Sequence, residues 1–330
     1  MNLRLVSIFL PLDKKTKADE ILRKSLIDEF WHDRISDKKV LIRALVLAEN
    51  IEGFLDELED EFSEVEGFRT VIMPVEASIP RFQVEQEEKL KNTKEKIGPE
   101  RVSREELYSN ISANTKLTWT YLVLIILASL VAAIGLIKGN VPMVVGAMII
   151  APLLGPSAGL SLGTVLGDFE LTFKSAKTLI VGISAGFVFS VLIGFVFQVN
   201  PHAPEIALRT GAGMGDVLVS LATGVVGALS FTTGTLTSLA GVMVAISLLP
   251  PLVVVGLLLG SGFIDLMFGA LLLFVINLVS VNLAGVVTFL IQKISPRTGW
   301  ERLKAQFLTG LAIFIWVMLL LAAVSAIVYS

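Results

Sequence analysis

Two short apolar segments hold the residues best suited to bind a solute through the protein backbone. They read APLLGP at Ala151–Pro156 and ISLLPP at Ile246–Pro251. Because proline has no amide hydrogen, each proline leaves one helical carbonyl without its usual donor. Inside a membrane, such a carbonyl must meet other protein groups or water. We therefore predict two broken helices near the bilayer midplane whose exposed backbone binds a small polar or ionic solute.

The charge of that solute stays open, since the amino ends of half-helices favour anions and freed carbonyls favour cations. Polar side chains close to the breaks, or in the sixth predicted span, extend the candidate pathway. Two interpretations of the asparagines stay open: they bind the solute, or they only hydrogen-bond neighbouring helices. The candidate pathway residues are Ala151, Pro152, Gly155, Pro156, Ser157, Ser247, Pro250, Pro251, Asn277 and Asn282.

A hydroxyl-rich segment follows the fourth predicted span. We expect it to form a polar loop on the cytoplasmic side, either lining a solute path or making an ordinary turn. Its residues are Thr232, Thr233, Thr235, Thr237 and Ser238.

Other kinds of site have little support in the sequence. The chain has no cysteine, which excludes thiolate metal sites and cysteine nucleophiles. No histidine or carboxylate lies deep in a predicted span, although proton relays in membranes normally use one. His32 and His202 each stand alone. We therefore expect no enzyme, no cofactor and no metal.

Charged residues are concentrated in the first third of the chain. Residues 1–116 hold 19 of the 27 basic and 24 of the 30 acidic residues, whereas 54% of the whole chain is hydrophobic. We therefore expect a soluble N-terminal part followed by a membrane domain at 117–330.

The N-terminal part has the pattern of an α+β domain at 1–80. Four apolar segments with strand character alternate with two segments of helical periodicity, in the order β-α-β-β-α-β. This order predicts a ferredoxin-like domain, and both a ligand sensor and an assembly module stay open. A charged linker and an amphipathic helix are expected at 81–116. The strands are expected at Leu3–Leu10, Phe30–Ile35, Val40–Ala48 and Phe68–Val75.

The remainder reads as an α-helical membrane bundle with about seven spans. Basic residues gather on one side, which predicts a cytoplasmic N-terminus and an external C-terminus. We expect the lipid bilayer as a partner and a homo-oligomer as the assembly, with no nucleic acid. The spans are Leu117–Ile137, Val141–Leu166, Phe173–Val199, Val217–Phe231, Leu236–Leu259, Phe263–Ile291 and Phe307–Val328.

The membrane domain matches itself at a shift of 95 residues. The shift pairs Pro156 with Pro251 and Gly167 with Gly262. Because each copy holds three spans, the second copy enters from the opposite side, and the repeats are predicted to be inverted. The first repeat covers about 117–199 and the second about 213–291, while the span at 307–328 lies outside both.

The run SREELYSNISANTKLTWTYLVLIILASLVAAIGL from Ser103, with the motif GAMIIAPLLGP at Gly146–Pro156, resembles a known family. It is a widespread prokaryotic family of uncharacterised, hydrophobic, multi-span membrane proteins, catalogued as a domain of unknown function. The resemblance implies a prokaryotic plasma-membrane protein with a small N-terminal domain. It implies no activity and no catalytic residue.

The sequence thus favours an integral membrane transporter or channel for a small polar or ionic solute, gated or assembled by the cytoplasmic domain. The alternative is a membrane-anchored ligand sensor or oligomeric scaffold without transport activity. A lipid-modifying enzyme has the least support, because no nucleophile–base pair lies within the spans.

Overall fold

A computed structural model describes residues 3–25, 27, 29–75, 78, 102–233, 237–296 and 299–329. Within these ranges, the side chains of residues 49, 237–239, 299–308 and 326–329 are not described. The chain divides into two compact units, residues 1–107 and 108–330. The predicted linker at 81–101 lies outside the described residues.

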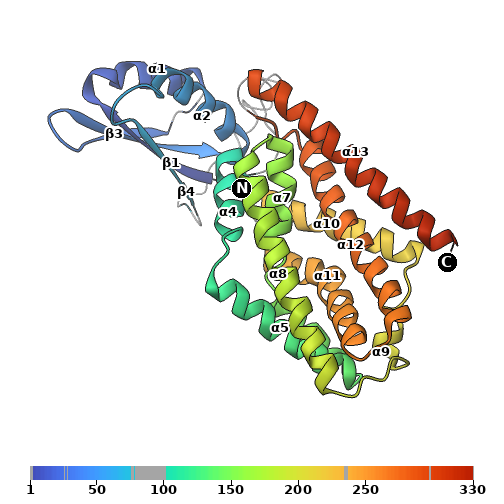
Figure 1. Ribbon diagram of the computed structural model, residues 1–330. Helices are drawn as coiled ribbons and strands as arrows, with labels where there is room; N and C mark the ends of the chain where they lie inside the picture. Colours follow the sequence, from blue (N-terminus) through green and yellow to red (C-terminus); the bar gives the residue numbers. More distant parts are fainter. Residues whose placement is uncertain are drawn as a thin grey trace. The chain divides into compact units, whose positions relative to one another are not determined.

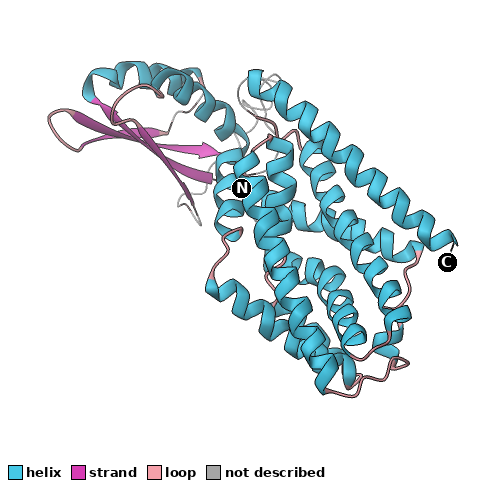
Figure 2. Cartoon of the chain, in the orientation of Figure 1, coloured by secondary structure: helices cyan, strands magenta, loops and turns pink. Residues whose placement is uncertain are grey.

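The first unit is a four-stranded antiparallel sheet in the order β2-β3-β1-β4, and α1 and α2 cover one of its faces (Figures 1 and 2). The observed order β-α-β-β-α-β is the predicted one. The elements are β1 (Leu3–Pro11), η1 (Leu12–Lys14), α1 (Lys15–Lys24), β2 (Phe30–Arg34), β3 (Lys39–Leu47), α2 (Ala48–Phe62) and β4 (Arg69–Pro74).

Alternation of side chains along the strands explains why one sheet face is apolar. Val6, Ile8 and Leu10 of β1 point to the helices and are almost completely buried. On α2, Ile51 and Leu58 meet the same core, two helical turns apart. The first unit therefore has a hydrophobic core of its own.

The second unit is helical, and it begins within α4, whose first turn belongs to the first unit (Figure 1). Ser103 caps α4, because its Oγ accepts a hydrogen bond of 3.2 Å from the amide of Glu106, three residues later. The helices are α4 (Arg104–Asn114), α5 (Trp119–Ile137), α6 (Val141–Ile150), α7 (Leu154–Leu166), α8 (Phe169–Val196), α9 (Pro204–Ala207), α10 (Met214–Thr233), α11 (Thr237–Gly260), α12 (Ile264–Ile291) and α13 (Gly299–Tyr329).

Five of these helices are long and apolar enough to cross a membrane, and the bent pair α6–α7 raises the number to six. The five are α5, α8, α10, α11 and α12. In α13 the described apolar part, Thr309–Ser325, is shorter than a full crossing, so the seventh span stays a prediction. The chain is therefore a multi-pass membrane protein by the length and composition of its helices.

Candidate functional site

The predicted break in the second span lies between α6 and α7. The two helices are bent by 51° at the residues 151–153 that separate them, and Ala151 is extended, with φ −70° and ψ 115°. Pro152 explains the break, since it cannot donate to the carbonyl of Met148, four residues before it. Pro156 lies in the first turn of α7, where a missing amide hydrogen breaks no intrahelical bond. The segment Val141–Leu166 is thus a broken helix, as expected.

A pocket of about 590 Å³ opens at this break. Three predicted pathway residues line it: Ala151, Pro152 and Gly155. The carboxyl end of α6 and the amino end of α7 therefore both reach the pocket, with partial charges of opposite sign. The other lining residues are Asn110, Asn114, Ile149, Ile150, Leu154, Phe231 and Gly241.

Sequence reasoning missed Asn110 and Asn114, which lie on α4. A Cβ atom built on Gly155 would overlap the backbone carbonyl oxygen of Asn114, so α7 and α4 meet in very close contact. The Nδ2 group of Asn114 donates to the carbonyl of Asn110 at 2.8 Å. The one signal for this packing was the pair Leu107 and Ile111, one turn apart and both fully buried.

Ser157 lies one turn into α7 and faces a second, much smaller cavity. It is 3% exposed, and its hydroxyl has no hydrogen-bond partner within the described part of the chain. Ser161, one turn further on, lines the same cavity and donates to the carbonyl of Asn282 at 3.2 Å. Pro156 is buried beside them. The hydroxyl groups of Ser157 and Ser161 therefore line the small cavity and not the large pocket.

The second break, expected at Ile246–Pro251, is absent: α11 runs unbroken through Pro250 and Pro251. The missing donor of Pro251 would have served the carbonyl of Ser247, four residues earlier. That carbonyl instead accepts a hydrogen bond from Nδ2 of Asn277 at 2.7 Å. The expectation of a second broken helix was therefore wrong: α11 is continuous, and at Pro251 a side chain from α12 replaces the lost backbone donor.

Two of the predicted pathway residues, Ser247 of α11 and Asn277 of α12, belong to a buried polar network and line neither described pocket. Oδ1 of Asn277 accepts from the hydroxyl of Ser220 at 2.7 Å. The hydroxyl of Ser247 lies 3.3 Å from that of Thr223. Asn277 is 5% exposed. This network joins α10, α11 and α12, and it is separate from the pocket at the first break.

Asn282 occupies a different environment. Its Nδ2 donates to the carbonyl of Leu278 on its own helix at 2.8 Å, and its Oδ1 has no partner among the described residues. Because Ser161 bonds its backbone carbonyl, Asn282 lies close to the small cavity.

The hydroxyl-rich segment begins as helix instead of loop. Thr232 and Thr233 close α10, and each donates to the carbonyl of Leu229, at 3.0 and 2.9 Å. Such bonds to the preceding turn are common for threonine in helices. Thr235 lies outside the described residues, and the side chains of Thr237 and Ser238, at the start of α11, are not described.

A tyrosine–aspartate pair joins α4 to the start of α8. The hydroxyl of Tyr108 donates to Oδ2 of Asp168 at 2.8 Å, and Oδ1 of Asp168 caps α8 by accepting from the amide of Leu171 at 2.9 Å. Burial and the hydrogen bond to Asp168 raise the pKa of Tyr108 to about 12. The phenol therefore stays neutral at physiological pH.

Comparisons with known proteins agree with the resemblance carried by Gly146–Pro156. Residues 148–283 match the family described as Domain of unknown function (DUF389). A protein of Methanocaldococcus jannaschii, described as "Uncharacterized protein MJ0678", is 34% identical over 331 residues, covering 100% of both chains. No solved structure matches the chain. The chain thus belongs to DUF389, a family of unknown function, and it has an uncharacterised full-length archaeal relative.

Proposed function

We propose that this protein is a membrane transporter or channel for a small polar or ionic solute, which enters through the pocket at the α6–α7 break. The observation that carries the proposal is this pocket of about 590 Å³, lined by Pro152, Gly155 and the two asparagines of α4. An apolar helix broken at a cavity is the arrangement that transporters use to present backbone groups to a solute. The proposal assigns no catalytic step to the chain.

An inverted repeat is part of the proposal, although only its first copy is broken. The bounds of α8 and α12 support it, because both helices have 28 residues and both bounds differ by 95. Gly167 and Gly262 have the same separation, and both have positive φ, at 65° and 82°. A helix end that turns through a left-handed glycine thus recurs at the position where each copy starts its third span.

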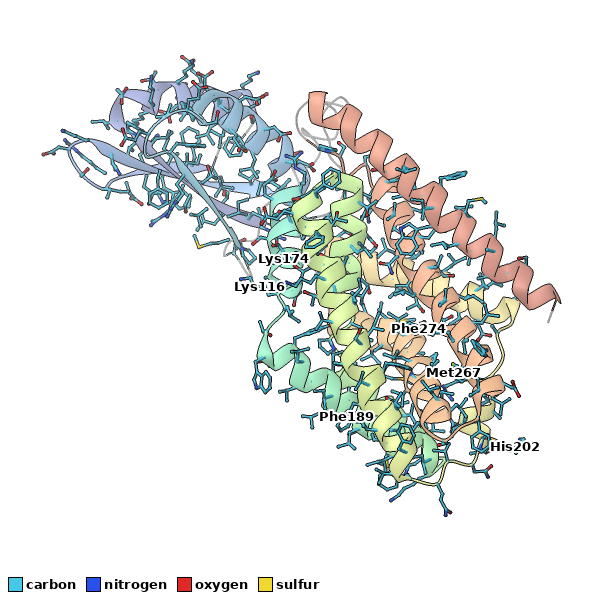
Figure 3. The ribbon with its side chains drawn as sticks, viewed as in Figure 1. Lys116, Lys174, Phe189, His202, Met267 and Phe274 are labelled. Carbon is cyan, nitrogen blue, oxygen red and sulfur yellow. The ribbon has the colours of Figure 1, made fainter. Side chains whose placement is uncertain are left out.

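The proposed orientation keeps the N-terminus in the cytoplasm. Lys116 and Lys174 lie close together at one end of the helical unit, whereas His202 lies at the other end (Figure 3). A basic end facing the cytoplasm agrees with the usual charge asymmetry of membrane proteins. The ferredoxin-like first unit would then gate or assemble the bundle from the cytoplasmic side of a prokaryotic plasma membrane.

A second candidate function, an oligomeric scaffold or ligand sensor, gains support from the polar network of Asn277, Ser220 and Ser247. These groups hydrogen-bond one another between α10, α11 and α12. Such contacts are expected of a membrane anchor whose polar side chains only hold its helices together.

Solute flux distinguishes the two functions. The protein would be reconstituted into liposomes and screened with inorganic cations, inorganic anions and small neutral metabolites, with protein-free liposomes as the control. The transport proposal expects flux of at least one solute class above that control. Absence of flux across the whole panel, with correctly folded protein in the liposomes, would favour the scaffold.

A further inference from the structure

Leu154, the first residue of α7, lies between two cavities. It lines the pocket of about 590 Å³ at the helix break and also the smaller cavity of about 10 Å³ behind it. The side chain is 8% exposed. Leu154 is the one residue that the described linings of these two cavities share.

The smaller cavity combines a suitable size with an unused polar group. A volume near 10 Å³ is about the space that one water molecule requires. Ser157 contributes a buried hydroxyl without a partner, and a buried polar group without a hydrogen bond costs free energy. Ser161 contributes a second hydroxyl, whose oxygen can still accept a hydrogen bond. Both features indicate a small polar occupant.

Two glycines place the side chain of Leu154 against the backbone of α10 and α11. A Cβ atom on Gly227 of α10 would lie 3.1 Å from Cδ1 of Leu154, and one on Gly241 of α11 would lie 3.8 Å from its Cδ2. The leucine side chain therefore lies against bare backbone on two neighbouring helices. Since the glycines offer no side chain there, the isobutyl group of Leu154 fills the space between the pockets.

We propose that the small cavity is a second binding site on the solute path, sized for one polar particle no larger than a water molecule, and that Leu154 closes it from the outer pocket. The role of the small cavity in transport rests on the proposed function, whereas its separation from the outer pocket by Leu154 does not. Removing the isobutyl group would join the two cavities. The hydroxyls of Ser157 and Ser161 would then be reachable from the pocket at the helix break.

Cysteine accessibility tests the closure without any transport assay. Because the native chain has no cysteine, Ser157→Cys introduces a single thiol with no background. The full chain in liposomes would be treated with methyl methanethiosulfonate, a small neutral reagent, and labelling would be followed by intact mass. We expect Ser157→Cys to be labelled at least tenfold faster when combined with Leu154→Ala than with Leu154 present.

Two controls isolate the effect of Leu154. Leu153→Ala truncates a neighbouring leucine that is also buried but lines neither cavity, and it should leave labelling of Ser157→Cys slow. Ser129→Cys places a thiol at another fully buried hydroxyl without a described partner, and its labelling should not respond to Leu154→Ala. If Ser157→Cys does not fold, Ser161→Cys in the same cavity replaces it.

Equal labelling of the cavity thiol in both backgrounds, whether fast or slow, would overturn the closure by Leu154. The flux assay tests the proposed transport function separately from the closure by Leu154. Gated labelling without flux would leave a cavity that Leu154 separates from the outer pocket and would refute transport, whereas flux without gated labelling would support transport by a route that avoids this cavity.

Discussion

Nδ2 of Asn277 donates a hydrogen bond of 2.7 Å to the carbonyl of Ser247. This carbonyl is the one that Pro251 leaves without a helical donor. A side chain on α12 thus substitutes for a backbone amide of α11, and α11 stays continuous through two prolines. The same asparagine accepts from Ser220 and so ties α10 to the pair.

Replacing Asn277 with leucine should therefore destabilise the helical unit. The carbonyl of Ser247 would lose its donor and the hydroxyl of Ser220 its acceptor, both in a buried region. Leaving such groups unsatisfied costs about 1–3 kcal/mol each. Thermal unfolding of the purified protein in detergent measures the change, and an unchanged midpoint would contradict the assigned role.

Pro251→Ala should reduce the cost of Asn277→Leu. An alanine at 251 supplies the missing amide, so the carbonyl of Ser247 no longer depends on Asn277. In a double-mutant cycle we expect a coupling free energy on the order of 1 kcal/mol. Strictly additive effects would show that Asn277 stabilises the unit in some other way.

Gly155 should not tolerate even an alanine. Its Cβ would overlap the backbone carbonyl of Asn114, and backbone cannot move aside as a flexible side chain can. Overpacking of this kind costs about 1–3 kcal/mol or more. Gly146→Ala is the matched control, because no described atom outside its own helix lies within 4 Å of its Cβ position. Thermal unfolding should separate the two variants, and equal stability would refute the close contact between α4 and α7.

The break at Pro152 was predictable from the sequence, whereas the continuity of α11 was not. In both segments, proline removes a donor and the local pattern is the same. What differs is a partner from another helix, Asn277, whose position depends on tertiary packing. The pocket was also only partly predictable: Gly155 was identified, but Asn114 belongs to the amphipathic helix expected within 81–116, to which no pocket was assigned.

The order of elements in the first unit followed from its apolar segments with strand character and its segments of helical periodicity. In contrast, the pairing of Arg4 with Glu106 joins residues about a hundred positions apart, and no local pattern could indicate it. Local periodicity thus predicted the elements, while long-range hydrogen bonds and close contacts required the structure.

Tyr108 should titrate far above an ordinary tyrosine. Its folded-state pKa of about 12 exceeds the unfolded value of about 10, because burial and Asp168 favour the neutral phenol. The resulting stabilisation is fully present below about pH 10 and is lost as the pH rises towards 12. Tyrosinate absorbance of the native protein minus that of Tyr108→Phe measures this group alone. A midpoint near pH 10 would contradict its burial against Asp168.

Glu106→Ala should destabilise the first unit more than Glu61→Ala does. Glu106 holds Arg4 through two hydrogen bonds, of 3.0 and 3.2 Å, and the Arg4 side chain is only 9% exposed. Removing it leaves a buried cation unpaired, at a cost of about 1–3 kcal/mol. The pair Lys17–Glu61 is exposed, so its loss should cost less than about 1 kcal/mol.

Hydrogen exchange at the amides of β1 in the full-length protein reports the stability of this unit. Faster exchange in Glu106→Ala than in Glu61→Ala is expected. Similar exchange in the two variants would show that the buried ion pair contributes no more than a surface pair.

Solute flux in a variant whose pocket is filled by a larger side chain tests the central claim, a solute path through the α6–α7 break, most directly. Gly241 lines the pocket, and its Cβ position has no atom nearer than 3.8 Å, so Gly241→Leu places a side chain in the cavity without a clash at its base. Gly146→Leu adds the same side chain outside the pocket. In liposomes, we predict that Gly241→Leu lowers the flux at least tenfold while Gly146→Leu retains it. Equal flux through both variants would contradict a solute path through the α6–α7 break.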